Sequence, residues 1–265
     1  MYLIIQDMFA ADVLPVNGAI ICSVQRRSIW VWGMDTAAEI LAIHKRAIWE
    51  IPEGLEYEEA AVMDPICNAY KAIAQRSGLL PGENVVIFGT GPLGLFSVQI
   101  AKIMGALNIV VVGLEEDVKV RFGVARQLGA TEVVNGSAED VVKRCQEICG
   151  GSDSIGLVVD CAGANICLKQ AIEMVRCNGE IVRVGMGFKP VGFSINDISM
   201  KAVSIIGHMA YDATSWRNSL QLLAAGRIQV KPMITHRLGL SRWEEGFEAM
   251  ADKEAIKVIL TYDFD

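Results

Sequence analysis

The sequence is poor in positive charge, and its cysteines show no pairing pattern. Its 24 Lys and Arg are outnumbered by 31 Asp and Glu, and the formal net charge of −7 argues against nucleic acid or an anionic membrane surface as a partner. The 7 Cys are odd in number and none belongs to a Cys-x-x-Cys pair, so a disulfide framework is not expected. A reducing, cytoplasmic location is therefore the expectation.

Long apolar runs are lacking as well. No run reaches the roughly 20 residues that span a bilayer. The apolar segment Met1–Ala11 contains Asp7 and has no basic start, so we do not expect a signal peptide there. The chain is nevertheless 52% hydrophobic and only 21% charged over 265 residues, which predicts a sizeable core in one large domain or two small ones.

From Gly82 onward, short apolar runs alternate with helical patterns. The runs that predict strands are Val85–Phe88, Asn108–Val112, Glu132–Asn135, Leu157–Cys161, Glu180–Gly185 and Val203–Gly207. The segments that predict helices between them are Leu93–Met104, Val118–Leu128, Ala138–Ile148 and Ile166–Val175. Continuous apolar runs are typical of strands that are buried on both faces. The alternation predicts an α/β fold with a doubly wound parallel sheet.

The flanking regions show weaker patterns. Before the sheet, we expect a strand or short helix at Thr36–His44, a turn at Trp49–Gly54, and a helix over Leu55–Arg76 that is interrupted near Pro65. After the sheet, the expected elements are a helix at Ser219–Ala225, an extended piece at Thr235–Leu238, a helix at Arg242–Ala251 and a last strand at Lys257–Tyr262.

The motif with the clearest chemistry follows the first predicted strand. Its residues are Gly89, Thr90, Gly91, Pro92, Leu93 and Gly94, in the pattern G-x-G-x-x-G. The pattern alone is weak, but here it joins a strand to a helix and begins a βαβ unit. Gly89 allows a tight turn, Gly91 lets the backbone approach a pyrophosphate, and Gly94 lets helix and strand pack closely. The helix N-terminus, with Pro92 in its first turn, would face the phosphates, so the motif predicts a Rossmann dinucleotide site.

An acidic residue at the end of the second strand usually accepts the adenosine ribose hydroxyls. Glu115 and Glu116 follow the strand Asn108–Val112 and are the candidates here, with Asp117 next to them. No Arg stands at this turn to bind a 2′-phosphate, and Lys119 is the nearest base. The pattern favours NAD(H) over NADP(H). The alternative is a solvated acidic first turn that binds nothing.

Short segments from about Gly33 to the end of the chain match the pattern of one family. They are Ala38-Glu39, Trp49–Leu55, Glu58–Ala61, Asp64-Pro65, Leu128–Ala130, Asp160–Gly163, Gly179-Glu180, Val184-Gly185, Lys231-Pro232, Thr235–Arg237 and Lys257-Val258. With the glycine motif they resemble the zinc-containing medium-chain dehydrogenases of the polyol, butanediol and threonine dehydrogenase branch. The resemblance implies hydride transfer between a small secondary alcohol and nicotinamide, with zinc polarising the alcohol oxygen.

The resemblance also implies a domain organisation. Residues 1–66 would be a remnant of a GroES-like catalytic domain, 67–209 the Rossmann domain, and 210–265 the return of the chain to the catalytic domain. Most of the family's N-terminal barrel has no counterpart here, and with it are missing the catalytic Cys, the Gly-His-Glu motif and the four Cys of a structural zinc. Cys22, ahead of Arg26-Arg27, is a candidate remnant of that lobe.

Three further residues are candidates for the site. Asp64 matches the family's zinc-proximal Glu before Pro, but one carboxylate cannot hold a catalytic zinc, which needs about three protein ligands. His208 ends a strand near the expected nicotinamide edge and is a candidate acid or base. Lys257 matches a basic residue that the family places near the cofactor phosphates; a solvated Lys on the last strand is the alternative. We therefore expect zinc to be absent from this chain.

Two functions remain open on this basis, and a zinc-independent reductase that uses other residues ranks behind them. The first is an oxidoreductase of the alcohol or polyol class, and the second is a non-catalytic dinucleotide-binding protein.

Without most of the barrel, an apolar surface would need cover from Met1–Val31 or from another subunit. The strand Val203–Gly207 should lie at the sheet edge, where pairing with a second copy would protect it, so we expect a homodimer.

Overall fold

Six parallel strands form the central sheet of the computed structural model, which describes residues 3–5, 14–17, 40–43 and 48–261. They are β5 (Asn84–Phe88), β6 (Ile109–Gly113), β7 (Glu132–Asn135), β8 (Ile155–Asp160), β9 (Glu180–Arg183) and β10 (Ser204–Gly207). Their spatial order is β10-β9-β8-β5-β6-β7, and every pair is parallel. The predicted doubly wound Rossmann sheet is confirmed, and β10 lies at an edge as expected.

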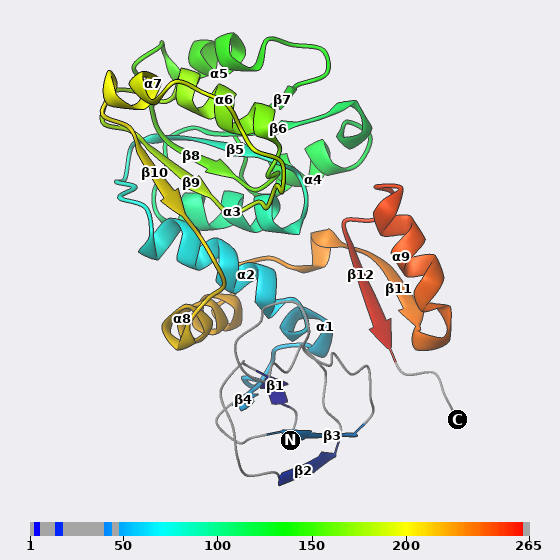
Figure 1. Ribbon diagram of the computed structural model, residues 1–265. Coiled ribbons are helices and arrows are strands. Elements are labelled where there is room, and N and C mark those ends of the chain that lie inside the picture. Colours follow the sequence, from blue (N-terminus) through cyan, green and yellow to red (C-terminus); the bar gives the residue numbers. More distant parts are fainter. Residues whose placement is uncertain (1–2, 6–13, 18–39, 44–47, 262–265) are drawn as a thin grey trace.

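Side chains of the central strands alternate between two apolar layers. Val85 and Ile87 point into one cluster, whereas Val86 and Phe88 point into the other, because successive residues of a strand face opposite sides. The first layer lies against α3 (Pro92–Ile103) and α4 (Arg121–Leu128), and the second against α5 (Val141–Cys149) and α6 (Asn165–Met174) (Figure 1). This two-sided burial explains the continuous apolar runs in the sequence.

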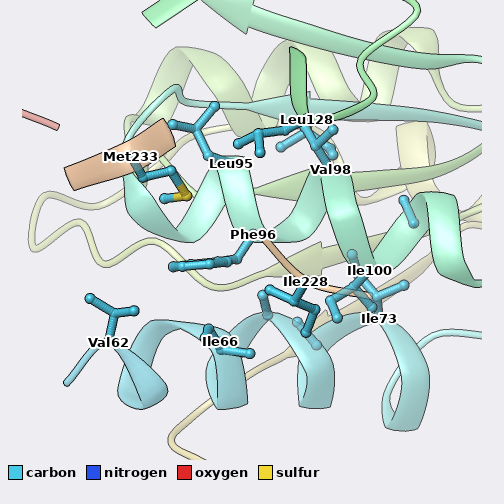
Figure 2. Packing of buried hydrophobic residues seen from close by; sticks show 14 of the residues in the cluster. Val62, Ile66, Ile73, Leu95, Phe96, Val98, Ile100, Leu128, Ile228 and Met233 are labelled. Carbon is cyan, nitrogen blue, oxygen red and sulfur yellow. The ribbon is translucent and has the colours of Figure 1, made fainter. Parts of the chain in front are cut away.

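A further helical layer covers α3 on the side away from the sheet. It consists of α2 (Met63–Tyr70), which continues as a π-helical turn over Lys71–Gln75, and α8 (Ala213–Ala224). Figure 2 shows Ile66 of α2 beneath Phe96 of α3, with Ile228 beside them. The Gln99 side chain of α3 donates to the Gln229 carbonyl (3.0 Å) and accepts from its amide (2.7 Å), so the segment after α8 is hydrogen-bonded to the Rossmann core.

The described strands outside this core form three small two-stranded sheets. The described N-terminal strands are β1 (Leu3–Ile5), β2 (Leu14–Asn17), β3 (Ile40–Ile43) and β4 (Ile48–Glu50), and they pair antiparallel as β1 with β4 and β2 with β3. At the C-terminal end, β11 (Ile234–Gly239) and β12 (Lys257–Thr261) pair in parallel and are connected through α9 (Trp243–Ala251).

Ion pairs connect the C-terminal unit, which comprises residues 231–261 with β11, α9 and β12, to α1 (Tyr57–Ala60) and its N-cap residue. Arg237 of β11 donates two hydrogen bonds to Glu58, of 2.6 and 2.9 Å, and these hold the pKa of Glu58 below its usual range. Lys231 donates to Glu56 at 2.6 Å. These ion pairs hold β11 and the segment before it against α1, and a second domain built from both chain ends stays a prediction. The boundaries at residues 66/67 and 209/210 stay a prediction.

Several boundaries differ from the sequence-based expectation. Trp49 and Glu50, expected in a turn, instead belong to strand β4, and the turn itself follows at Pro52–Leu55. The helix interruption near Pro65 is confirmed, because α1 ends before α2 and Pro65 lies in the first turn of α2, where it needs no amide partner. Helix α8 begins earlier than expected because Asp212 accepts hydrogen bonds from the amides of Thr214 and Ser215.

Other differences concern short elements. The acidic residues Glu115–Asp117 form a separate 3-10 turn, so α4 begins only at Arg121 rather than at Val118. A short helix, α7 (Ile195–Ser199), was not predicted. Cys22 and most of Met1–Val31 lie outside the described residues, so the interpretations of these residues stay predictions. Among the residues that the structure describes, no helix is long and apolar enough to cross a membrane.

Candidate dinucleotide-binding site

The glycine motif forms the turn between β5 and α3. Gly89 has φ +104°, a left-handed conformation that a residue with a side chain rarely adopts. Its amide donates to the Val112 carbonyl of β6 at 2.8 Å. Gly91 is the N-cap residue of α3, and Pro92 and Leu93 are the first two residues of the helix. The first-turn amides of α3 thus open at the carboxyl end of the sheet, where parallel α/β folds bind ligands.

Gly94 and Gly91 differ in what a side chain would meet at each position. A Cβ atom on Gly94 would lie 1.9 Å from the carbonyl oxygen of Gly89, so only glycine lets α3 approach the turn. A Cβ atom on Gly91 would meet nothing within 4 Å. The fold therefore does not need a glycine at position 91, but a ligand that approaches this backbone would. This geometry fits a pyrophosphate at the start of α3.

The acidic turn after β6 lies beside the glycine motif. A Cβ atom on Gly113 would come within 2.8 Å of the Thr90 methyl carbon, which shows how closely the two turns approach each other. Glu115 accepts a hydrogen bond from the Asn135 side chain at 2.5 Å, at the end of β7. Glu116 instead pairs with Lys253 of the C-terminal unit, which lowers the pKa of Glu116. The two candidates from the sequence therefore point to different partners.

Asp117, which the sequence left as a neighbour, holds the turn together. Its buried carboxylate accepts from the Leu114 amide at 2.8 Å and lies 3.5 Å from the Arg121 guanidinium. Arg121 also donates to the Ala255 carbonyl at 2.8 Å. A capping-box signal could have indicated this role, because an acidic residue at the third position of a helical turn can accept the backbone amide of the N-cap residue, here Leu114.

A second polar network lies at the carboxyl ends of β8 and β9, and sequence reasoning missed it. The fully buried Asp160 accepts hydrogen bonds from the Ala162 amide (3.1 Å), the Gly163 amide (2.8 Å) and the Arg183 guanidinium (2.6 Å). Arg183 also donates to the Gly163 carbonyl at 2.8 Å. Burial raises the pKa of Asp160, and the Gly163 amide and Arg183 oppose this rise. The network fixes the loop that lies beside Gly89.

The structure brings Asp64 and His208 together through a residue that the sequence did not single out. Asn68 donates to the Asp64 backbone carbonyl (3.1 Å), and its side-chain oxygen lies 3.2 Å from the Nε2 atom of His208. The side-chain amide of Asn68 is also 3.4 Å from the Asp64 carboxylate. Desolvation raises the pKa of Asp64, although the side chain keeps contact with solvent and a Tyr211 hydrogen bond opposes the rise.

His208 is a neutral imidazole at pH 7. Burial, together with the positive charges of Lys71 and Arg76, lowers its pKa to about 4. Because Asn68 presents an oxygen to Nε2, that atom carries the hydrogen, and the buried Nδ1 atom has no hydrogen-bond partner among the described residues. A base with so low a pKa is mostly unprotonated but weak near neutral pH.

The lowered pKa of His208 predicts a pH-dependent stability. The unfolded chain takes up a proton near pH 6.5, whereas the folded chain takes it up only near pH 4. The contribution of neutral His208 to the free energy of unfolding is therefore fully present above about pH 6.5. It falls, by an expected ~2 kcal/mol, as the pH drops toward 4. Urea unfolding at pH 7.5 and pH 4.5 checks this. A His208→Gln variant should lose less stability between the two pH values, and an equal loss in both chains would contradict the assignment.

Lys257 opens β12, and its positive charge acts on Asp64. The predicted contact of Lys257 with cofactor phosphates stays a prediction.

Within the described ranges, no three His, Cys, Asp or Glu side chains gather closely enough to hold a metal ion. The described residues around Asp64 thus do not fit a catalytic zinc. Cys145 and Cys149 are buried thiols whose pKa values burial raises to about 12 and about 11, which suits packing rather than metal binding.

Fold and glycine turn together define the class of the protein: a Rossmann-type α/β fold with a glycine-rich turn at the carboxyl end of its parallel sheet. The sequence profile of the family described as "Zinc-binding dehydrogenase" matches residues 92–225. The chain belongs to this family. The resemblance seen in the sequence is confirmed.

Individual relatives agree with this family. The chain is 73% identical over 227 residues to the zinc-type alcohol dehydrogenase-like protein YdjL of Escherichia coli K12, covering 86% of this chain and 63% of the relative. It is 29% identical to sorbitol dehydrogenase of Halalkalibacterium halodurans, covering 84% of this chain and 64% of the relative. The chain therefore spans slightly less than two thirds of the length of these relatives.

Solved structures match over the same extent. One is 2R,3R-butanediol dehydrogenase from Bacillus subtilis, with a TM-score of 0.77, 28% identity, and coverage of 85% of this chain and 63% of the other. Another is the alcohol dehydrogenase TADH from Thermus sp. ATN1, with a TM-score of 0.80, 29% identity, and coverage of 86% and 67%. Both are dehydrogenases that share the α/β fold.

Proposed function

We propose that this chain binds a nicotinamide dinucleotide and acts as an oxidoreductase of the alcohol or polyol dehydrogenase type. The bound nicotinamide would accept or give the hydride that a secondary alcohol or its ketone exchanges. The observation that carries the proposal is the open space at Gly91, directly at the N-terminus of α3. The names of the relatives, which include sorbitol dehydrogenase, support a small alcohol as the substrate.

Each part of the turn has a role in this proposal. The amides at the start of α3, from Leu93 onward, would bind the pyrophosphate, and Gly91 leaves room for it. Glu115, at the carboxyl ends of β6 and β7, would accept the adenosine ribose hydroxyls, which favours NAD(H). Lys257 would add a positive charge near the phosphates. At the other end, Asn68 would fix the tautomer and orientation of His208.

A second candidate function is favoured by one observation. Among the described residues, no group of three His, Cys, Asp or Glu side chains could hold a catalytic metal, so Asp64 belongs to no such group. A metal or a positioned base supplies several kcal/mol to alcohol oxidation in general. A chain without either would bind dinucleotide without turnover. The non-catalytic binding protein is therefore the alternative.

One experiment separates the two candidates. The purified chain is titrated calorimetrically with NADH and with NADPH, its metal content is measured on the same sample, and NAD⁺ reduction is followed with a panel of polyols. Binding with turnover supports the oxidoreductase. Binding with no turnover on any polyol supports the alternative. Absence of binding by both cofactors would overturn the site itself.

We also propose that the chain forms a homodimer through β10. This strand is a sheet edge, and Ile205 on it is exposed, as are Phe188 and Met200 in the preceding segment. Unpaired strand edges with apolar neighbours favour pairing with another chain. Light scattering after size exclusion should give twice the chain mass, and Ile205→Lys should shift it toward the monomer. A monomeric unsubstituted chain would contradict the proposal.

A further inference from the structure

We propose that Lys253 is a specificity-determining residue, which raises the affinity for NADPH relative to NADH by neutralising Glu116 beside the adenosine ribose. The inference rests on the proposed dinucleotide binding at the glycine turn. It concerns a residue of the C-terminal unit, far from the glycine motif in sequence. The contact that motivates it is the ion pair between Lys253 and Glu116.

The position of the acidic turn places it next to the cofactor's adenosine half. The turn follows β6, the strand next to β5, and Gly113 at its start lies against Thr90 of the glycine motif. A dinucleotide whose pyrophosphate lies at Gly91 would extend its adenosine ribose across the end of β6, as in doubly wound folds generally. The residues directly after Gly113 would then surround the ribose 2′ position.

Three carboxylates of this turn differ in their partners. Asp117 is paired with Arg121, and Glu116 is paired with Lys253. Glu115 accepts from the neutral Asn135 amide and has no cationic partner among the described side chains. A ribose hydroxyl needs only one such acceptor. A 2′-phosphate, with a charge of about −2, is repelled by every carboxylate that lacks a cation. Lys253 thus removes one of two repulsions and brings an ammonium group to the same place.

The backbone around Lys253 supports a role for its side chain. Lys253 has φ +60°, at the position after α9 where helices commonly place glycine. A residue with a side chain is strained in this left-handed conformation, so glycine would suit the backbone better. The hydrogen bond from Arg121 to the Ala255 carbonyl holds the same loop against the acidic turn. The loop is therefore held by Arg121 whether or not residue 253 is a lysine, which leaves the Lys253 charge free to be tested.

The test compares dissociation constants for NADH and NADPH in variants of the full chain. Lys253→Glu should weaken NADPH binding about tenfold at low salt and change NADH binding less than threefold. The reason is that the new negative charge repels the 2′-phosphate, which NADPH has and NADH lacks. Glu116→Gln should shift the ratio of the two constants in the opposite direction. Lys143→Glu, an exposed lysine on α5, makes the same charge change away from the turn and should leave the ratio unchanged. Thermal unfolding checks that all variants are folded.

The outcomes separate this inference from the proposed function. If the unsubstituted chain binds a cofactor and Lys253→Glu leaves the ratio unchanged, the inference is overturned and the dinucleotide site stands. An equal weakening of both cofactors in Lys253→Glu would assign the lysine a structural role and also overturn it. If the unsubstituted chain binds neither cofactor, the proposed function fails and the inference fails with it.

Discussion

A Gly91→Ala variant is expected to fold like the parent chain and to bind NADH at least tenfold more weakly. Apart from its chain neighbours, no residue that the structure describes has an atom within 4 Å of the added methyl group, so the core packing stays unchanged. It would occupy the space through which the pyrophosphate approaches the start of α3. Calorimetric titration with NADH measures the loss, and thermal unfolding shows whether the fold is intact.

Gly94→Ala is the matched comparison. The same methyl group at position 94 would lie 1.9 Å from the Gly89 carbonyl oxygen, a backbone atom that cannot move without shifting the turn. Overpacking of this kind typically costs about 1–3 kcal/mol, and we expect at least that loss here. If Gly91→Ala binds NADH as tightly as the parent chain, the pyrophosphate does not lie at this turn and the proposed site is wrong.

Asp160→Ala is expected to lower the free energy of unfolding by about 3 kcal/mol. The carboxylate is fully buried and accepts from two backbone amides as well as from Arg183. Removal of one partner from a buried ion pair leaves the other charge uncompensated, which typically costs 3–5 kcal/mol. The lower end of this range applies because Arg183 retains some contact with solvent. Urea unfolding at pH 7 measures the change.

The control for Asp160→Ala is a solvent-exposed ion pair with the same distance between its charged atoms. Arg242 and Glu245 also approach to 2.6 Å, but more than half of each side chain is exposed. Such pairs contribute about 0–1 kcal/mol, so Glu245→Ala should change stability little. A loss below 1 kcal/mol for Asp160→Ala would mean that the amides of Ala162 and Gly163 find other partners, and that the Asp160 network does not fix the loop beside Gly89.

The Rossmann sheet could be predicted from the sequence because its signals are local. Strands β5 and β6 are continuous apolar runs, since layers of helices cover both faces of the sheet. The glycine motif is also local, because the turn, the close backbone approach and the helix start fall within six neighbouring residues. The early start of α8 was missed, although Asp212 before Thr214 and Ser215 is a recognisable cap.

The partners of the site residues could not be predicted in the same way. Glu115 and Glu116 are adjacent in sequence and chemically equivalent, yet one contacts Asn135 and the other contacts Lys253. His208 was a candidate because of its strand, but its partner Asn68 lies on α2, 140 residues earlier. Such contacts depend on how the layers stack, which no local pattern records.

The sequence by itself therefore determined the sheet, the glycine turn and the family, because these follow from hydrophobic periodicity and from steric limits on a few neighbouring residues. Only the tertiary structure decided which of Glu115 and Glu116 pairs with a lysine, which tautomer His208 adopts, and which buried carboxylate holds the loop beside Gly89. The physical reason is that charge pairing and burial depend on distances between elements that are far apart in the chain, and packing alone sets those distances.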